Sequence, residues 1–152
     1  MNRIVVWIAG LLAAVLVVAH QARAAGPAAD PVFGVWLTQS KDGKVRIAPC
    51  AADPAQACGV VLSGKGPNGE DARTLTDLKN PDPALRTRPI VGLQIISGFR
   101  RDGEGGWTGG RIYEPQSGRT YKAKMQSGGP DALKVAGCVL FFCRAETWTR
   151  VE

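Results

Sequence analysis

The sequence predicts an all-β protein in which about eight short antiparallel strands form a barrel or a sandwich. Runs rich in β-branched and aromatic residues recur along residues 32–151, several alternate apolar with polar positions, and glycine-rich or proline-containing turns separate them. No stretch between these runs has the apolar period of an amphipathic helix. A barrel would remove the exposed edges that an open meander leaves. A barrel of this size is either filled by side chains or holds one small ligand.

The strands follow one another with a turn signal after most of them. Residues 32–40 form the first predicted strand, and Asp42-Gly43 then marks a hairpin turn. In the second strand Val45 and Ile47 share one face and charged residues take the other. The full set of predicted strands is 32–40, 44–49, 59–63, 90–100, 107–113, 120–125, 133–139 and 144–151.

The stretch before the central strand differs from its surroundings and predicts a short helical or 3-10 turn over residues 80–85. Asn80 is a good N-cap, Pro81 suits the first helical position, and Asp82 favours the positive end of the turn. Leu85 is expected to point toward the core. We expect the whole stretch to fold over one end of a barrel.

Two arginines in this stretch allow a functional and a structural interpretation. Arg86 and Arg88 could clamp the carboxylate or phosphate of a ligand, because a guanidinium suits that task. They could equally pair with Asp77 and Asp82 and hold the turn in place. We favour the structural interpretation because the charged partners are close in sequence. Four further arginines lie at strand ends and are expected to be solvated: Arg100, Arg101, Arg111 and Arg119.

The first residues predict export from the cytoplasm. Asn2-Arg3 is a short positive start, residues 4–19 are an almost unbroken apolar run, and Ala22-Arg23-Ala24 is a small-x-small cleavage site. The apolar run is too short to span a bilayer comfortably, so we interpret it as a secretory signal. We expect a periplasmic or secreted protein.

The predicted organisation therefore has three parts. Residues 1–24 are the signal peptide, residues 25–31 a flexible mature N-terminus, and residues 32–152 one β-domain. No transmembrane segment is expected after cleavage.

The composition after cleavage argues against several functions. Loss of Arg3 and Arg23 leaves 17 basic and 13 acidic residues, a charge of +4, without the clustered basic stripe of a nucleic-acid binder. Cleavage also removes His20, the only histidine. A histidine-free protein has no Ser-His-Asp triad and no histidine-ligated metal. We therefore expect no enzymatic activity, cofactor or metal, and assign no catalytic residue.

Four cysteines predict two disulfides. Their spacings are not those of a zinc site, and an exported chain meets an oxidising environment. Of the three connectivities we prefer the two local ones, because each would staple a turn between two predicted strands. The cysteines are Cys50 with Cys58 and Cys138 with Cys143.

The aromatic residues on predicted strands are candidates for an apolar pocket as well as for the core. A set that faces the interior of a barrel could line a binding cavity. The candidate ligand-binding residues are Arg86, Arg88, Trp107, Tyr113 and Tyr121.

Two local motifs resemble the signature of lipocalins and other calycins. Gly34-Val35-Trp36 lies on the first strand and Trp148-Thr149-Arg150 on the last. The resemblance implies that Trp36 plugs one end of a closed barrel and that Arg150 packs across it. A guanidinium over an indole gains cation–π attraction and can donate to nearby carbonyls. Together with the strand pattern, it implies a calycin-like barrel, with Gly34, Trp36, Trp148 and Arg150 in structural roles. The capping signals described above add Asn80 and Asp82 to this structural set.

A wider resemblance covers the chain from about Phe33 to Val151. The chain is similar to a family of exported bacterial proteins, domain-of-unknown-function family 2147. This family implies an exported calycin-like barrel and no established reaction. The residues that carry the resemblance are Gly34-Val35-Trp36, Asn80-Pro81-Asp82, Leu85-Arg86-Thr87-Arg88-Pro89, Gly92-Leu93, Gly109-Gly110-Arg111-Ile112-Tyr113, Gly118-Arg119-Thr120-Tyr121 and Thr147-Trp148-Thr149-Arg150.

Three functions remain open at this point. The first is a periplasmic module that binds a small apolar or amphipathic ligand, with an anionic head near Arg86 or Arg88. The second is a structural or protein-interaction module of the cell envelope with a filled barrel. The third is a histidine-free enzyme that uses two carboxylates. We rank them in that order.

Overall fold

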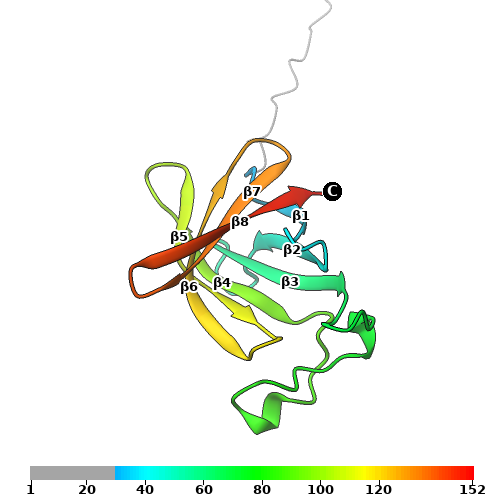
Figure 1. Cartoon of the computed structure of the whole chain (residues 1–152). Helices are drawn as coiled ribbons and strands as arrows, with labels where there is room; N and C mark the ends of the chain where they lie inside the picture. Colours follow the sequence, from blue (N-terminus) through cyan, green and yellow to red (C-terminus); the bar gives the residue numbers. More distant parts are fainter. Residues whose placement is uncertain (1–29) are drawn as a thin grey trace, which may run out of the picture.

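The computed structural model describes residues 30–152, which form one closed barrel of eight antiparallel strands (Figure 1). The predicted signal peptide and all but the last two residues of the predicted flexible N-terminus lie outside the described residues. No helix of residues 30–152 is long and apolar enough to cross a membrane. The strands are β1 (Gly34–Leu37), β2 (Gly43–Pro49), β3 (Gln56–Gly64), β4 (Gln94–Arg101), β5 (Gly106–Glu114), β6 (Arg119–Ser127), β7 (Ala132–Val139) and β8 (Phe142–Arg150).

Each strand pairs with its neighbour in sequence, and β1 pairs with β8 to close the sheet. The closing pairs are Trp36 with Arg150 and Leu37 with Thr149. The predicted number and order of strands are confirmed, and the barrel is confirmed over the sandwich. Because β1 is so short, most of β8 has no strand partner on that side.

The interior is filled by alternate residues of the strands. On β6, for example, Ala123 and Met125 are buried, whereas Lys122 and Lys124 are exposed. This alternation follows from the two-residue period of a strand. The buried core comprises Val32, Trp36, Val45, Ile47, Ala57, Ile96, Phe99, Trp107, Ala123, Met125, Leu133, Val135 and Trp148.

One end of the barrel is closed by Trp36 and Arg150. The guanidinium carbon of Arg150 lies 4.2 Å from the centroid of the Trp36 ring, and the indole nitrogen donates to Val32 O at 2.9 Å. Arg150 also donates to Phe33 O at 2.9 Å and to Pro130 O at 2.6 Å. A Cβ on Gly34 would lie 2.0 Å from Arg150 Nη1, so only glycine leaves room for this arginine. The contact implied by the Gly-x-Trp resemblance is present.

The opposite end carries the longest connection of the barrel. Residues 65–93, which we name the strap, join β3 to β4 and project from the barrel in Figure 1. The strap contains two 3-10 turns, η1 (Ala72–Thr74) and η2 (Pro83–Leu85). The turn 115–118 and the β7–β8 turn lie at the same end.

The predicted helical turn is present but shorter than expected, and two details of the prediction are wrong. Asp82, not Asn80, caps η2, because its side chain accepts from the amide of Ala84 at 2.9 Å. Leu85 is 39% exposed and does not reach the core. Two prolines around Asp82 push the turn toward the carboxyl end of the stretch, which carries Leu85 away from the barrel.

Both predicted disulfides are confirmed. Cys50–Cys58 joins β3 to the residue after β2, and Cys138–Cys143 joins β7 to β8 across their turn. Each therefore staples two neighbouring strands.

Replacement of Arg150 by methionine should destabilise the closed end. Arg150→Met removes the cation–π contact and the charged donors to backbone carbonyls, which together are worth roughly 2–3 kcal/mol of unfolding free energy. Urea denaturation followed by tryptophan fluorescence measures the loss. Arg119→Met on β6 is the control, since the Arg119 side chain is exposed. Equal stability of the two variants would contradict the account of the closed end.

Candidate functional site

Asp77 is a fully buried carboxylate at the centre of a polar cluster. Arg88 Nε donates to Asp77 Oδ2 at 2.8 Å, and Arg88 Nη2 lies 2.7 Å from the same oxygen. The Tyr113 hydroxyl donates to Asp77 Oδ1 at 2.5 Å, and Asn80 Nδ2 donates to Oδ2 at 2.7 Å. Asp77 itself has 0% exposure. A buried charge is tolerated when it is paired and hydrogen-bonded in this way.

The backbone of the strap brings Asp77 beside Arg88. The amide of Asp77 donates to Arg88 O at 2.9 Å, and Ile90 N donates to Leu75 O at 3.1 Å. Thr76 and Pro89 form an isolated antiparallel bridge between these bonds. The two limbs of the strap therefore run side by side, and the ion pair lies across them.

Asn80 and Gly118 fix the strap to the barrel. Asn80 is 5% exposed, and its Nδ2 donates to the Tyr113 hydroxyl at 3.3 Å. A Cβ on Gly118 would lie 1.9 Å from Lys79 O, so the strap backbone rests directly on the β5–β6 turn. Gly118 also has a φ of +71°, which favours glycine. Tyr113 supplies the second attachment, from β5.

Burial raises the pKa of the Tyr113 phenol above its usual value, and the hydrogen bond to the Asp77 carboxylate raises it further. Ionisation would place a second negative charge beside Asp77. Arg88 acts in the opposite direction, with its guanidinium 5.7 Å from the Tyr113 ring centroid. The cluster therefore holds Tyr113 as a hydrogen-bond donor.

Two adjoining cavities lie beside this cluster, and we name them together the outer groove. The first has a volume of about 340 Å³ and lies between the strap and strands β4 to β6; the second has about 510 Å³ and extends toward the Cys50–Cys58 disulfide. Gln94, Ser97 and Arg111 line both. The remaining lining residues are Asn80, Pro81, Arg88, Ile95, Tyr113 and Thr120 in the first and Cys50, Ala51, Ala52, Asp53, Gln56, Cys58, Gly98 and Gly109 in the second.

The groove changes character along its length. Its strap end presents Arg88, Asn80 and the Tyr113 phenol, and Arg111 lies in the segment shared by both cavities. Its other end is bordered by the disulfide and two alanines, although Asp53 and Gln56 also lie there. Gly98 and Gly109 carry no side chains to fill this part. Asp53 is engaged by Arg100, whose Nη2 lies 2.6 Å from its carboxylate.

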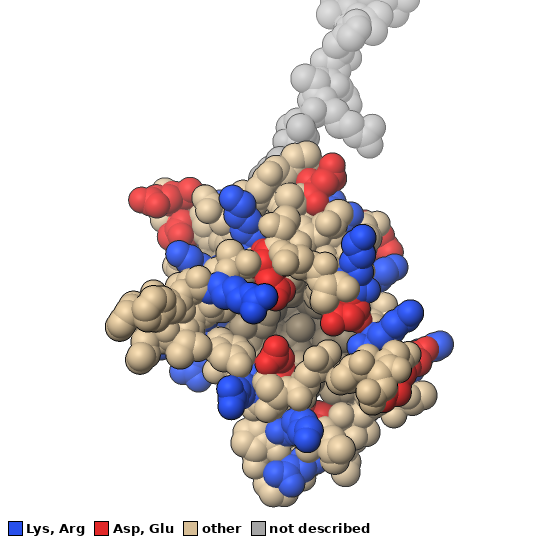
Figure 2. All heavy atoms as spheres, viewed as in Figure 1, with Lys and Arg blue, Asp and Glu red and all other residues tan. Residues whose placement is uncertain are grey.

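The inner face of the sheet also carries polar and half-buried side chains away from the closed end. Figure 2 shows a hollow near the centre of the molecule, with acidic and basic side chains at its edge. Tyr121 follows the alternation of Ala123 and Met125 and faces inward, half-buried. Glu146 lies on the same side of β8 as Trp148, whose indole nitrogen donates to it at 3.4 Å. Below these residues the core is filled.

The structure separates the five candidate ligand-binding residues into three places. Arg88 and Tyr113 line the outer groove together. Arg86 lies outside it and donates from Nε to Asn80 O at 2.8 Å. Trp107 is buried in the core near the closed end, and Tyr121 faces the interior. For Arg88 the partner is Asp77, as the structural interpretation expects.

Sequence reasoning missed Arg111, Ser97 and the two glycines of the groove. Arg111 was expected only to be solvated, because its neighbours across the strands were unknown. The signal available was Gly98 and Gly109 inside predicted strands, since such glycines mark bulges or a close approach. Both have positive φ, 73° and 72°.

No group of three or more His, Cys, Asp or Glu in residues 30–152 is arranged to hold a metal ion.

Three surface carboxyl groups have shifted pKa values, and all three shifts are downward. The hydrogen bond from Arg73 lowers the pKa of Asp71 to about 2, and backbone and side-chain donors lower those of Asp53 and Glu70.

Alkaline titration should reveal the buried phenol. Of the two tyrosines in the chain, Tyr113 should ionise later than free tyrosine, whose pKa is about 10. Because its pKa is raised by folding, the protonated phenol stabilises the folded state below that pH. This stabilisation is lost as the pH rises through the raised pKa. The absorbance of tyrosinate measures the transition. Tyr113→Phe should remove the late transition and Asp77→Asn should move it earlier; a late transition that survives Tyr113→Phe would contradict the assignment.

Comparisons with known proteins agree with this geometry. Residues 34–150 match the family model described as uncharacterized protein conserved in bacteria (DUF2147). A solved structure, protein HP1028 from Helicobacter pylori, described as belonging to the lipocalin family, is 21% identical, with a TM-score of 0.67 over 79% of this chain and 82% of that one. No curated protein matches. The fold is therefore a lipocalin-like barrel, and the chain belongs to the DUF2147 family of bacterial proteins.

Proposed function

We propose that this protein is an exported binding protein for a small amphipathic ligand, held in the outer groove. The observation that carries the proposal is the pair of adjoining cavities, with Arg88 at one end, Arg111 in the segment common to both, and a less polar region at the other end. The disulfides agree with export to an oxidising compartment. The lipocalin-like fold is compatible with a small ligand.

The strap end would hold an anionic head. Asp77 engages Arg88 through Nε and Nη2, so the two N–H groups of Nη1 and the second N–H of Nη2 are left for a ligand. Arg111 makes no ion pair with a described residue. Two guanidinium groups with a phenol beside them favour a carboxylate or phosphate.

The other end would hold a short apolar tail. Gly98 and Gly109 have no side chains to occupy this part of the groove. The Cys50–Cys58 disulfide and Ala51 border the same part. The tail would lie on the outside of the sheet, because the interior is occupied by Trp36, Phe99 and the rest of the core.

We further propose binding without catalysis. A carboxylate enzyme needs an acid with a raised pKa. Among the described carboxyl groups with a shifted pKa, every shift is downward. Residues 25–152 also contain no histidine.

Calorimetric titration with decanoate tests the groove. Decanoate should bind, and decyltrimethylammonium should not, because the head site is cationic. Arg111→Gln should weaken decanoate binding about ten-fold. Ser97→Trp should abolish it by filling the segment common to both cavities. Thr149→Trp, on an exposed position of β8, is the matched control and should bind as the wild type does.

Three results would overturn the proposal in different ways. Binding that survives Ser97→Trp but is lost in Tyr121→Ala would place the ligand in the barrel interior. Equal binding of decyltrimethylammonium would show that the groove does not select an anionic head group. Absence of binding, together with a clean apo mass of the protein purified after export, would favour the interaction module.

A further inference from the structure

The β7–β8 turn presents four consecutive large apolar side chains to solvent. Val139 is 58% exposed, Leu140 87%, Phe141 81% and Phe142 73%. The Phe141 and Phe142 rings lie 4.7 Å apart and contact each other. We name these four residues the apolar tip. Hairpin turns ordinarily use glycine, asparagine or aspartate, so this composition calls for a separate reason.

The fold keeps the apolar tip extended from the barrel. Val139 pairs with Phe142, and Cys138 pairs with Cys143 directly beneath them. The disulfide between these cysteines ties the two strands at the base of the tip. Leu140 has a φ of 55°, which a leucine adopts only at a cost. The sequence therefore retains an apolar residue where a polar one would suit the backbone better.

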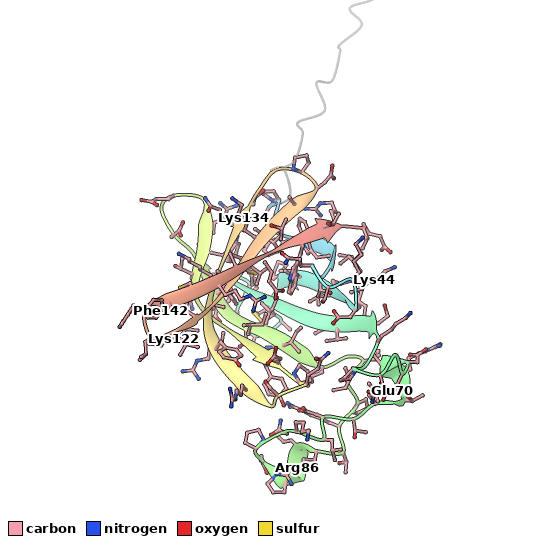
Figure 3. The ribbon with its side chains drawn as sticks, viewed as in Figure 1. Lys44, Glu70, Arg86, Lys122, Lys134 and Phe142 are labelled. Atoms are coloured by element: carbon pink, nitrogen blue, oxygen red, sulfur yellow. A yellow bond between two sulfur atoms is a disulfide. The ribbon has the colours of Figure 1, made fainter. Side chains whose placement is uncertain are left out.

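Basic side chains lie on the strands behind the tip. Lys122 on β6 is opposite Cys138, and Arg144 on β8 is opposite Gly137. Figure 3 shows Lys122 close to Phe142 at the same projecting corner of the barrel. Residues 119–124 add Arg119 and Lys124, and neither 119–124 nor 136–145 contains an acidic residue. Apolar residues at the apex and cations at the base are therefore combined in one projection.

We propose that the apolar tip inserts into the interfacial region of an anionic phospholipid membrane. Leu140, Phe141 and Phe142 would enter the boundary between headgroups and acyl chains, and Lys122 and Arg144 would meet the lipid phosphates. Peripheral membrane binding uses this combination of buried apolar area and attraction to anionic lipids.

The shape of the tip favours a membrane over a protein partner. A protein groove receives one face of an inserted element and seals it with a polar rim. Here four adjacent apolar residues are exposed by more than half of their surface, and the charged residues of 119–124 and 136–145 are all basic. A lipid surface accommodates apolar side chains pointing in several directions.

Vesicle co-sedimentation tests the proposal on protein purified after export, with its amino terminus verified by mass spectrometry. The vesicles contain three parts phosphatidylethanolamine to one part phosphatidylglycerol, and phosphatidylcholine vesicles are the neutral comparison. The wild type should bind the anionic vesicles at least ten-fold more tightly. Leu140→Ser with Phe141→Ser should lower that affinity at least ten-fold. Leu78→Ser is the matched control, because Leu78 is 67% exposed in the strap, and should bind as the wild type does.

A second pair of variants separates charge from apolar contact. Lys122→Gln with Arg144→Gln should weaken binding to anionic vesicles and reduce its dependence on salt, whereas Lys134→Gln should not. Failure of the wild type to bind, or equal binding by the Leu140→Ser, Phe141→Ser variant, would overturn the proposal. Self-association in the absence of vesicles that this variant abolishes would also overturn it, by making the tip an interface between copies.

Discussion

The buried carboxylate of Asp77 is the constraint on which the candidate site depends. A carboxylate shielded from solvent needs hydrogen-bond donors for its oxygens. Asp77 receives them from Asn80 and Arg88 of the strap and from Tyr113 of β5. Because Tyr113 belongs to the barrel and Arg88 to the strap, satisfying this one group fixes the strap against the sheet. The space between them is the first cavity of the groove. The proposed ligand site therefore arises where the strap is fixed to neutralise a buried charge.

The two ends of the barrel use the same chemistry for different purposes. At the closed end the guanidinium of Arg150 covers an indole and binds the carbonyls of both termini, which completes the core. At the other end the guanidinium of Arg88 lies over a phenol and binds a carboxylate, and Arg88 also lines the first cavity. The groove runs along the outside of the sheet from the strap to the β2–β3 connection.

Most of the fold could be predicted from the sequence because its signals are local. Alternation in residues such as Val45 and Ile47, the turn residues and the cysteine spacing depend only on neighbours along the chain. The site could not be predicted to the same extent. Arg111 and Gly109 belong to one strand and Gly98 to another, so their shared groove depends on register. Leu85 was misplaced because capping rules located the turn but not the direction in which it leaves the barrel.

Native-state hydrogen exchange of the Asp77→Asn variant tests the central claim most directly. The amides of Asp77, Asn80 and Ile90 donate within the strap, and loss of the buried ion pair should destabilise these bonds by about 2–4 kcal/mol. Their exchange should therefore accelerate roughly 30- to 1,000-fold, while the amides of β6 and β7 keep the protection of the wild type. Unchanged exchange in the strap, or equal acceleration throughout the barrel, would contradict the role assigned to Asp77.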